Sequence, residues 1–143
     1  MDFNEIVEGA TVFLPVNVPG ALLYVGDGHA AQGDGELTGN ALETSMDVEF
    51  TVHLQKRAGL TMPRLETKDI IVSIGSQPEF MSGLNRALEM ATVDMTDWLV
   101  KSYGLEPWAA HQLIGVQAHY EVVTVAGSVA LGIPKRVLPA GTR

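Results

Sequence analysis

An apolar stripe in the middle of the chain constrains the fold more than any other feature. Apolar residues recur there at steps of three or four, the spacing that lines one face of an α-helix: Phe80, Leu84, Leu88, Ala91, Met95 and Leu99. Ser76 and Glu79 have the spacing of a capping box, Pro78 is tolerated in a first helical turn, and Gly104 is a natural C-terminal cap. The pattern predicts a long amphipathic helix over residues 78–103.

The residues before this helix are typical of β-structure. Met46, Val48, Phe50 and Val52 alternate with polar residues, which predicts a strand with one buried face over residues 46–53. Two short apolar runs, residues 11–16 and 21–25, flank a Pro-Gly turn signal and are expected to pair as a hairpin. Another apolar run, residues 70–74, predicts a further strand.

The C-terminal half is predicted to hold a shorter helix and two closing strands. The helix is expected from Pro107 to about Val116, and the strands over residues 120–125 and 129–133. The whole pattern predicts one α+β domain over residues 1–143, with a β-rich N-terminal part folded as sandwich- or barrel-like sheets. On the long helix, Asp94 is expected on the solvated face, and the tryptophans are expected in the core or at an interface.

Charge and composition exclude several classes of function. The 143 residues include 46% hydrophobic residues and carry a formal net charge of −8. Such a chain repels phosphate backbones, so we expect no nucleic-acid partner. It has no apolar run long enough to span a bilayer, so we expect no membrane partner. Its acidic N-terminus does not resemble a signal peptide and it has no cysteine, so we expect a cytoplasmic location. The absence of cysteine removes disulfides, thiolate metal sites and a cysteine nucleophile.

A loop rich in glycine and acidic residues, residues 26–36, carries the strongest functional signal. Its glycines let the backbone approach a ligand closely, and its carboxylates and imidazole are ligands that divalent ions accept. Asp27 and His29 are two residues apart and would point the same way on a strand end, so both are expected to reach one ion, such as Zn²⁺. Asp34 and Glu36 have the same spacing and are expected to form a second wall of the site.

A loop rich in glycine and aspartate is more often a tight connection than a site, and composition alone leaves that alternative open. The spacing of its acidic residues does not match an EF-hand. The spacing of its glycines does not match a dinucleotide-binding fingerprint, and its carboxylates would repel a pyrophosphate.

A longer motif around this loop resembles the signature region of the acetamidase/formamidase family. The motif runs from Leu14-Pro15-Val16 through Gly20-Ala21-Leu22 and Gly26-Asp27-Gly28-His29-Ala30-Ala31-Gln32-Gly33-Asp34-Gly35-Glu36 to Gly39, Ala41 and Glu43. The similarity continues more weakly to Ile133-Pro134-Lys135. The resemblance implies hydrolysis of a small linear amide, formamide or acetamide, to the acid and ammonia.

On the positions of this motif, chemistry suggests a set of roles. Asp27 and His29 would bind a divalent metal, expected to be zinc, that polarises the amide carbonyl. Glu36 would be the general base, and Asp34 a second ligand or an orienting residue. Gln32 would hold the substrate amide. Glu43 lies an odd number of residues from Glu36, so it lines the site only if a bulge intervenes; otherwise it is a solvated carboxylate.

The resemblance covers only part of the family's length. Members are considerably longer, and this chain resembles their second half. We therefore expect either a homo-oligomer or a partner subunit that supplies the N-terminal half. The alternative to a hydrolase is a non-catalytic structural domain whose exposed apolar surface drives association.

Overall fold

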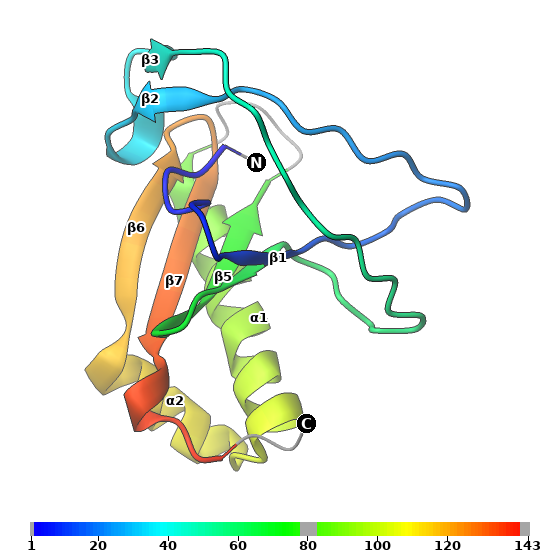
Figure 1. Cartoon of the computed structure of the whole chain (residues 1–143). Helices are drawn as coiled ribbons and strands as arrows, with labels where there is room; N and C mark the ends of the chain where they lie inside the picture. The colour runs from blue at the N-terminus through cyan, green and yellow to red at the C-terminus, as the bar shows by residue number, and fades with distance from the viewer. Residues whose placement is uncertain (1, 78–82, 141–143) are drawn as a thin grey trace.

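The computed structural model describes residues 2–77 and 83–140. Its centre is a five-stranded antiparallel sheet in the order β1-β4-β5-β7-β6, packed against two helices, and a separate two-stranded sheet pairs β2 with β3 (Figure 1). The strands are β1 (Thr11–Phe13), β2 (His29–Ala31), β3 (Leu42–Glu43), β4 (Arg64–Glu66), β5 (Ile70–Ser76), β6 (His119–Thr124) and β7 (Ser128–Pro134). The helices are α1 (Leu84–Tyr103) and α2 (Pro107–Gln117), with short 3₁₀ turns η1 (Asp34–Glu36) and η2 (Lys135–Val137).

The middle of the sheet is formed by β5 and β7, which pair along their whole length from Ile70–Pro134 to Ser76–Ser128. Every residue of β7 is buried, and so are the five inner residues of β5. Both strands are mostly apolar and do not alternate regularly with polar residues, as expected of strands that are covered on both faces.

Alternate residues of these strands enter two different cores. Ile71, Leu131 and Ile133 face the helices and pack against Met95, Trp98 and Leu99 of α1 and Ala110 and Ile114 of α2. On the opposite face, Val72, Ile74 and Ala130 pack with Leu65, Val123 and Phe3. The N-terminal segment therefore covers the sheet face that the helices leave open, and this placement brings the first residues of the chain near the loop of residues 26–36.

The prediction that Asp94 is solvated was wrong. The Asp94 side chain is 5% exposed, and its carboxylate accepts two hydrogen bonds from Arg64, at 2.8 and 2.9 Å, and one from Ser73 at 2.7 Å. The Arg64 guanidinium also lies 4.6 Å from the ring centre of Trp98, and Phe13 meets the same ring edge-on. Trp98 is thus a core residue as predicted, whereas Trp108 is exposed.

The structure confirms the α+β class and most elements of the C-terminal half. Helix α1 ends at Tyr103, and Gly104 caps it in the left-handed conformation with φ of 66°. The expected start, at Pro78 with Glu79 and Phe80, lies outside the described residues; the described helix begins at Leu84 after Gly83. The predicted second helix and both closing strands are present, and none of the described helices is long and apolar enough to cross a bilayer.

Two predicted strands are wrong. Residues 11–16 and 21–25 do not form a hairpin, because β1 pairs with β4 and residues 21–25 are in no strand. Residues 46–53 are likewise extended without a partner strand. Alternation sets which side chains share a face, but a strand also needs a neighbour for its backbone hydrogen bonds. The two extended segments, residues 14–27 and 44–60, project from the body, and we call them the arm (Figure 1).

Candidate active site

The small β2–β3 sheet places a histidine opposite a glutamate. His29 and Glu43 are directly paired across the antiparallel ladder, and the ladder shifts register between His29 and Ala31. The Thr44 amide donates to the Gly28 carbonyl at 2.9 Å, which extends this pairing by one residue. Directly opposite residues have side chains within contact distance. The turn that returns the chain from η1 to β3, through Gly39 at φ of 71°, therefore decides that Glu43 reaches His29.

The third member of this group is Asp27. Its backbone has a φ of 63°, in the left-handed region that aspartate tolerates better than most residues. Asp27 Oδ1 lies 3.5 Å from His29 Nε2, and Glu43 Oε2 lies 3.0 Å from the same nitrogen. One ligand atom from each of these three residues lies within 4.8 Å of the others, so the group could hold one metal ion.

The His29 ring is buried while the carboxylates facing it are open to solvent. The side chain of His29 is 6% exposed, against 64% for Asp27 and 55% for Glu43. Although Glu43 is close, the geometry is not that of a hydrogen bond, and the buried Nε2 has no hydrogen-bond partner among the described residues. A buried imidazole nitrogen without a partner, aimed between two carboxylates, fits the ligand set of a divalent ion such as Zn²⁺.

The other side of the imidazole is held by Asp2 and Gln32. Asp2 Oδ1 lies 4.0 Å from His29 Nδ1 and accepts a 2.7 Å hydrogen bond from the Gln32 side-chain amide. Burial by itself lowers the pKa of His29, but a hydrogen bond with Gln32 and the carboxylates of Glu43, Asp27 and Asp2 outweigh it and raise the pKa above its ordinary value. Such partners behind a ligand fix the orientation of its ring.

Glu36 is a further carboxyl group near His29, and it lies next to Asp2. A hydrogen bond from its carboxyl to Asp2 raises the pKa of Glu36, and burial and the charge of Asp2 raise it further. The protonated form of Glu36 can donate to Asp2, whereas the ionised form would face another negative charge, so the neutral form is favoured. The charges of His29 and Asp27 also act on Glu36, so Glu36 lies next to the three possible metal ligands.

Asp34 faces a different part of the molecule. It accepts a 3.4 Å hydrogen bond from Asn4, and it interacts with Glu121 of β6. Gly35, between Asp34 and Glu36, has a φ of 78°, and its carbonyl accepts a 2.9 Å hydrogen bond from the Val125 amide. The expectation that Asp34 and Glu36 form one wall is therefore wrong: their spacing of two implies a shared face only in a strand, and this segment is a 3₁₀ turn.

The structure thus brings together Asp27, His29, Gln32 and Glu36 from the predicted set, adds Glu43, and separates Asp34. Asp2 was missed by reasoning from spacing, because it lies 27 positions before His29 and reaches it only when Phe3 enters the core of the sheet. The three residues that could hold a metal come from one strand end and the strand paired with it.

The profile of the acetamidase/formamidase family matches residues 1–137. The chain belongs to this family. Its fold is similar to the crystal structure of an acetamidase from Yersinia enterocolitica, with 31% identity and a TM-score of 0.80. An acetamidase from Bacillus halodurans is similar with 29% identity and a TM-score of 0.82. A predicted acetamidase/formamidase from Thermoanaerobacter tengcongensis is similar with 27% identity and a TM-score of 0.71.

This acetamidase/formamidase family chain spans less than half of these solved proteins. The similarity covers 96% of the chain but 41% of the Yersinia protein, and 94% of the chain but 45% of the Bacillus protein. The similarity therefore includes almost the whole chain.

Proposed function

We propose that this chain takes part in hydrolysis of a small linear amide, formamide or acetamide, to the acid and ammonia. The observation that carries the proposal is the buried His29 Nε2 between Asp27 and Glu43, with Glu36 beside them, in a chain of the acetamidase/formamidase family. We assign the metal position to Asp27, His29 and Glu43. A divalent ion bound there, such as Zn²⁺, would polarise the amide carbonyl and lower the pKa of a water molecule.

The proton transfers are assigned to Glu36. Acting as a carboxylate, it takes a proton from the water that attacks the carbonyl carbon, and it returns that proton to the nitrogen as the carbon–nitrogen bond breaks and ammonia leaves. A raised pKa suits a group that must both accept and donate a proton near neutral pH. Asp2 positions Glu36 through their shared hydrogen bond.

Gln32 is assigned a positioning role. Its amide NH₂ donates to Asp2, and the side chain also interacts with His29, so it holds the imidazole and the carboxyl pair in place. The sequence-based prediction that Gln32 holds the substrate amide would require it to give up one of these contacts. The predicted role of Asp34 as a ligand has less support, because its described neighbours are Asn4 and Glu121.

A test of this proposal measures ammonia release from formamide and acetamide by the purified chain supplied with Zn²⁺. We expect Glu36→Gln to lower the rate by about 100-fold or more, because the loss of a general base typically costs that much. The matched control is Glu89→Gln, an exposed residue on α1 that pairs only with Arg86 among the described contacts, and it should keep the wild-type rate. Circular dichroism checks that both variants fold. Wild-type turnover in Glu36→Gln would refute the assignment of the base.

A second candidate function is a non-catalytic structural domain. It is favoured by the row of exposed apolar side chains on the arm, which a hydrolase site does not need. Absence of ammonia release from a folded chain that binds Zn²⁺ would support this candidate, and loss of Zn²⁺ binding in Glu43→Ala, measured by titration calorimetry, would still establish the metal position independently.

A further inference from the structure

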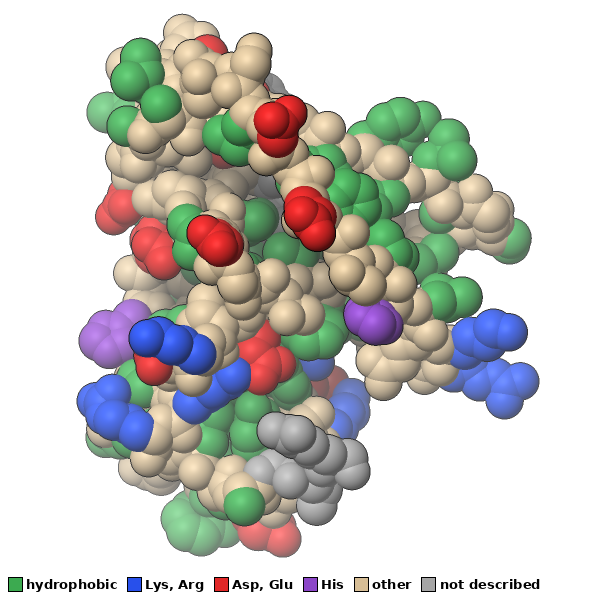
Figure 2. All heavy atoms as spheres, viewed as in Figure 1, with side chains coloured by type: hydrophobic (Ala, Val, Ile, Leu, Met, Phe, Trp, Pro, Cys, Tyr) green, Lys and Arg blue, Asp and Glu red, His purple; other side chains and the backbone are tan. Residues whose placement is uncertain are grey.

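One segment of the arm has no role in the candidate active site. Over residues 46–54 the backbone is extended, and it makes no backbone–backbone hydrogen bond to any part of the chain that the structure describes. Every second side chain is apolar and more than half exposed: Met46 52%, Val48 53%, Phe50 55%, Val52 67% and Leu54 73%. Figure 2 shows apolar side chains spread along the arm and Lys and Arg side chains at its end.

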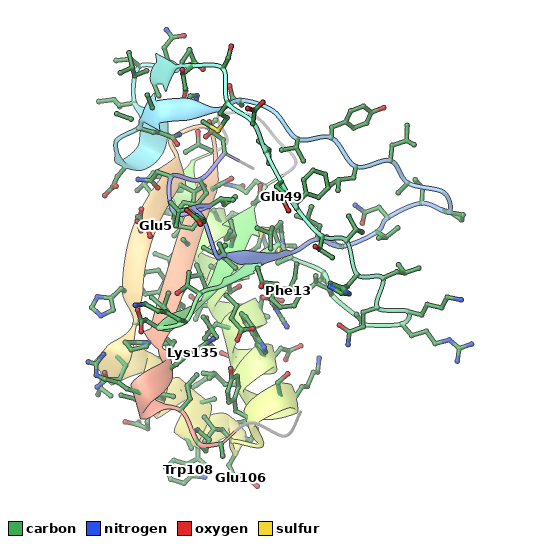
Figure 3. All side chains as sticks on the ribbon, viewed as in Figure 1. Glu5, Phe13, Glu49, Glu106, Trp108 and Lys135 are labelled. Atoms are coloured by element: carbon green, nitrogen blue, oxygen red, sulfur yellow. The ribbon has the colours of Figure 1, made fainter. Side chains whose placement is uncertain are left out.

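Such a segment is an unpaired strand with an uncovered apolar face. An extended backbone with free N–H and C=O groups pairs readily with another strand, which is why exposed edges are sites of association. The intervening side chains are polar, Asp47, Glu49, Thr51 and His53, so the segment has one apolar and one polar face. Pairing would satisfy its backbone groups and bring apolar side chains of the two strands into contact along one face. Figure 3 shows Glu49, one of these polar residues, on this segment.

The order of residues in this segment is symmetric about Phe50. In an antiparallel pair of two identical segments centred there, Phe50 lies opposite Phe50, Val48 opposite Val52, and Met46 opposite Leu54. A twofold interface requires a surface that is complementary to itself, and this pattern provides one. We propose that two copies of this chain associate by antiparallel pairing of residues 46–54, centred on Phe50.

The charges on the polar face select the antiparallel arrangement. In this register Asp47 of one copy lies opposite His53 of the other, and Glu49 lies opposite Thr51. Parallel pairing in register would place Asp47 against Asp47 and Glu49 against Glu49, and like charges directly opposite each other are destabilising. Aromatic and β-branched pairs across strands are the favourable ones, and the antiparallel register supplies them at its centre.

The pairing does not depend on the proposed amide hydrolysis. It begins three residues after Glu43, the last residue of β3, so the paired strand continues the backbone that holds the candidate metal ligands. The solved acetamidases are more than twice as long as this chain. The alternative partner for the arm is therefore additional polypeptide like that of these longer proteins. The two occupants differ in whether the chain alone forms a dimer.

The absence of cysteine in this sequence makes a cross-linking test specific. Oppositely paired residues in an antiparallel sheet have Cα atoms about 4.5–5.5 Å apart, within the range of a disulfide. Under mild oxidation Phe50→Cys should therefore give a covalent dimer. Val52→Cys is the matched control on the same face. In this register residue 52 of one copy lies about 14 Å from residue 52 of the other copy, so this variant should stay uncrosslinked.

Light scattering after size-exclusion chromatography tests the association itself. The wild-type chain should have twice the 15.3 kDa mass of one copy. Phe50→Asp should raise the dimer dissociation constant by about tenfold or more, because it places like charges opposite each other. Val116→Asp, at an exposed position on α2, should leave the dimer intact. A monomeric wild-type chain, or a dimer in which Phe50→Cys does not cross-link, would overturn the proposal; a monomer would point to the additional polypeptide instead.

Discussion

At the scale of single residues, the candidate site depends on how His29 is surrounded. Its ring is buried, yet the charged neighbours that raise its pKa are three carboxylates, Glu43, Asp27 and Asp2. Asp27 lies two residues before His29 and reaches it although its backbone is left-handed and not extended. Glu43 and Asp2 join them only through the return of β3 and the burial of Phe3.

Glu121 gives a prediction about pH. Burial raises the pKa of Glu121, and the nearby carboxylates of Asp34 and Glu5 raise it further. Because its pKa is higher in the folded than in the unfolded chain, ionisation of Glu121 destabilises the fold. That cost is absent below the ordinary pKa of 4.5 and is complete once the pH has risen through the folded value. Glu121→Gln should therefore raise the melting temperature at pH 7 and leave it unchanged at pH 4.

Thermal unfolding followed by circular dichroism between pH 4 and pH 8 measures this effect. Glu8→Gln, at an exposed position, is the control and should change the melting temperature little at either pH. An equal gain for Glu121→Gln at pH 4 and pH 7 would show that its effect is one of packing and not of charge.

At the scale of elements, Asp94 joins α1 to two strands. Its carboxylate accepts hydrogen bonds from Arg64 of β4 and Ser73 of β5, while Arg64 in turn covers the ring of Trp98. The sequence led us to expect Asp94 on the solvated face of α1, and nothing in it indicated that a cation 30 positions earlier would meet this carboxylate. A buried carboxylate is tolerated here because both of its oxygens accept hydrogen bonds, from Arg64 and Ser73.

Asp94→Ala should lower the free energy of unfolding by about 3 kcal/mol, because it leaves the guanidinium of Arg64 without its partner in a mostly buried position. Asp97→Ala removes a carboxylate from the same helix, but one that pairs with Lys101 at the surface, and should change stability by roughly 0.5 kcal/mol or less. Urea unfolding of the two variants makes the comparison. Similar losses would mean that the buried network contributes no more than an exposed ion pair.

At the scale of the whole molecule, the distance between the helix layer and the sheet is set at Gly75. A Cβ atom at this position of β5 would lie 1.9 Å from the Ala87 carbonyl oxygen and 2.6 Å from the Ala91 nitrogen of α1. No side chain fits between the two backbones, so glycine permits a contact that any other residue would force apart.

Gly75→Ala should therefore destabilise the protein by roughly 1–3 kcal/mol, the usual cost of overpacking. Gly115→Ala is the opposite case, because a Cβ there has no atom within 4 Å and the residue lies in α2, where alanine is favoured. It should stabilise the protein by about 0.5–1 kcal/mol. Melting temperatures of both variants test this contrast, and a neutral Gly75→Ala would show that α1 shifts freely over the sheet.

The sequence by itself determined the elements whose pattern is local. The apolar stripe and Gly104 specify α1 and its end, and mostly apolar runs specify β5 and β7. In each case the residues that interact are neighbours in sequence, so their geometry follows from the backbone period.

Only the tertiary structure decided which distant segments meet. It placed Asp2 and Glu43 beside His29, separated Asp34 from Glu36, and buried Asp94 against Arg64. It also left residues 46–54 without a partner strand, although their alternation is that of a strand. The physical reason is the same throughout. The repeat of side-chain directions along a strand or helix determines which side chains share a face, whereas the segment that packs against that face depends on contacts between residues far apart in the chain.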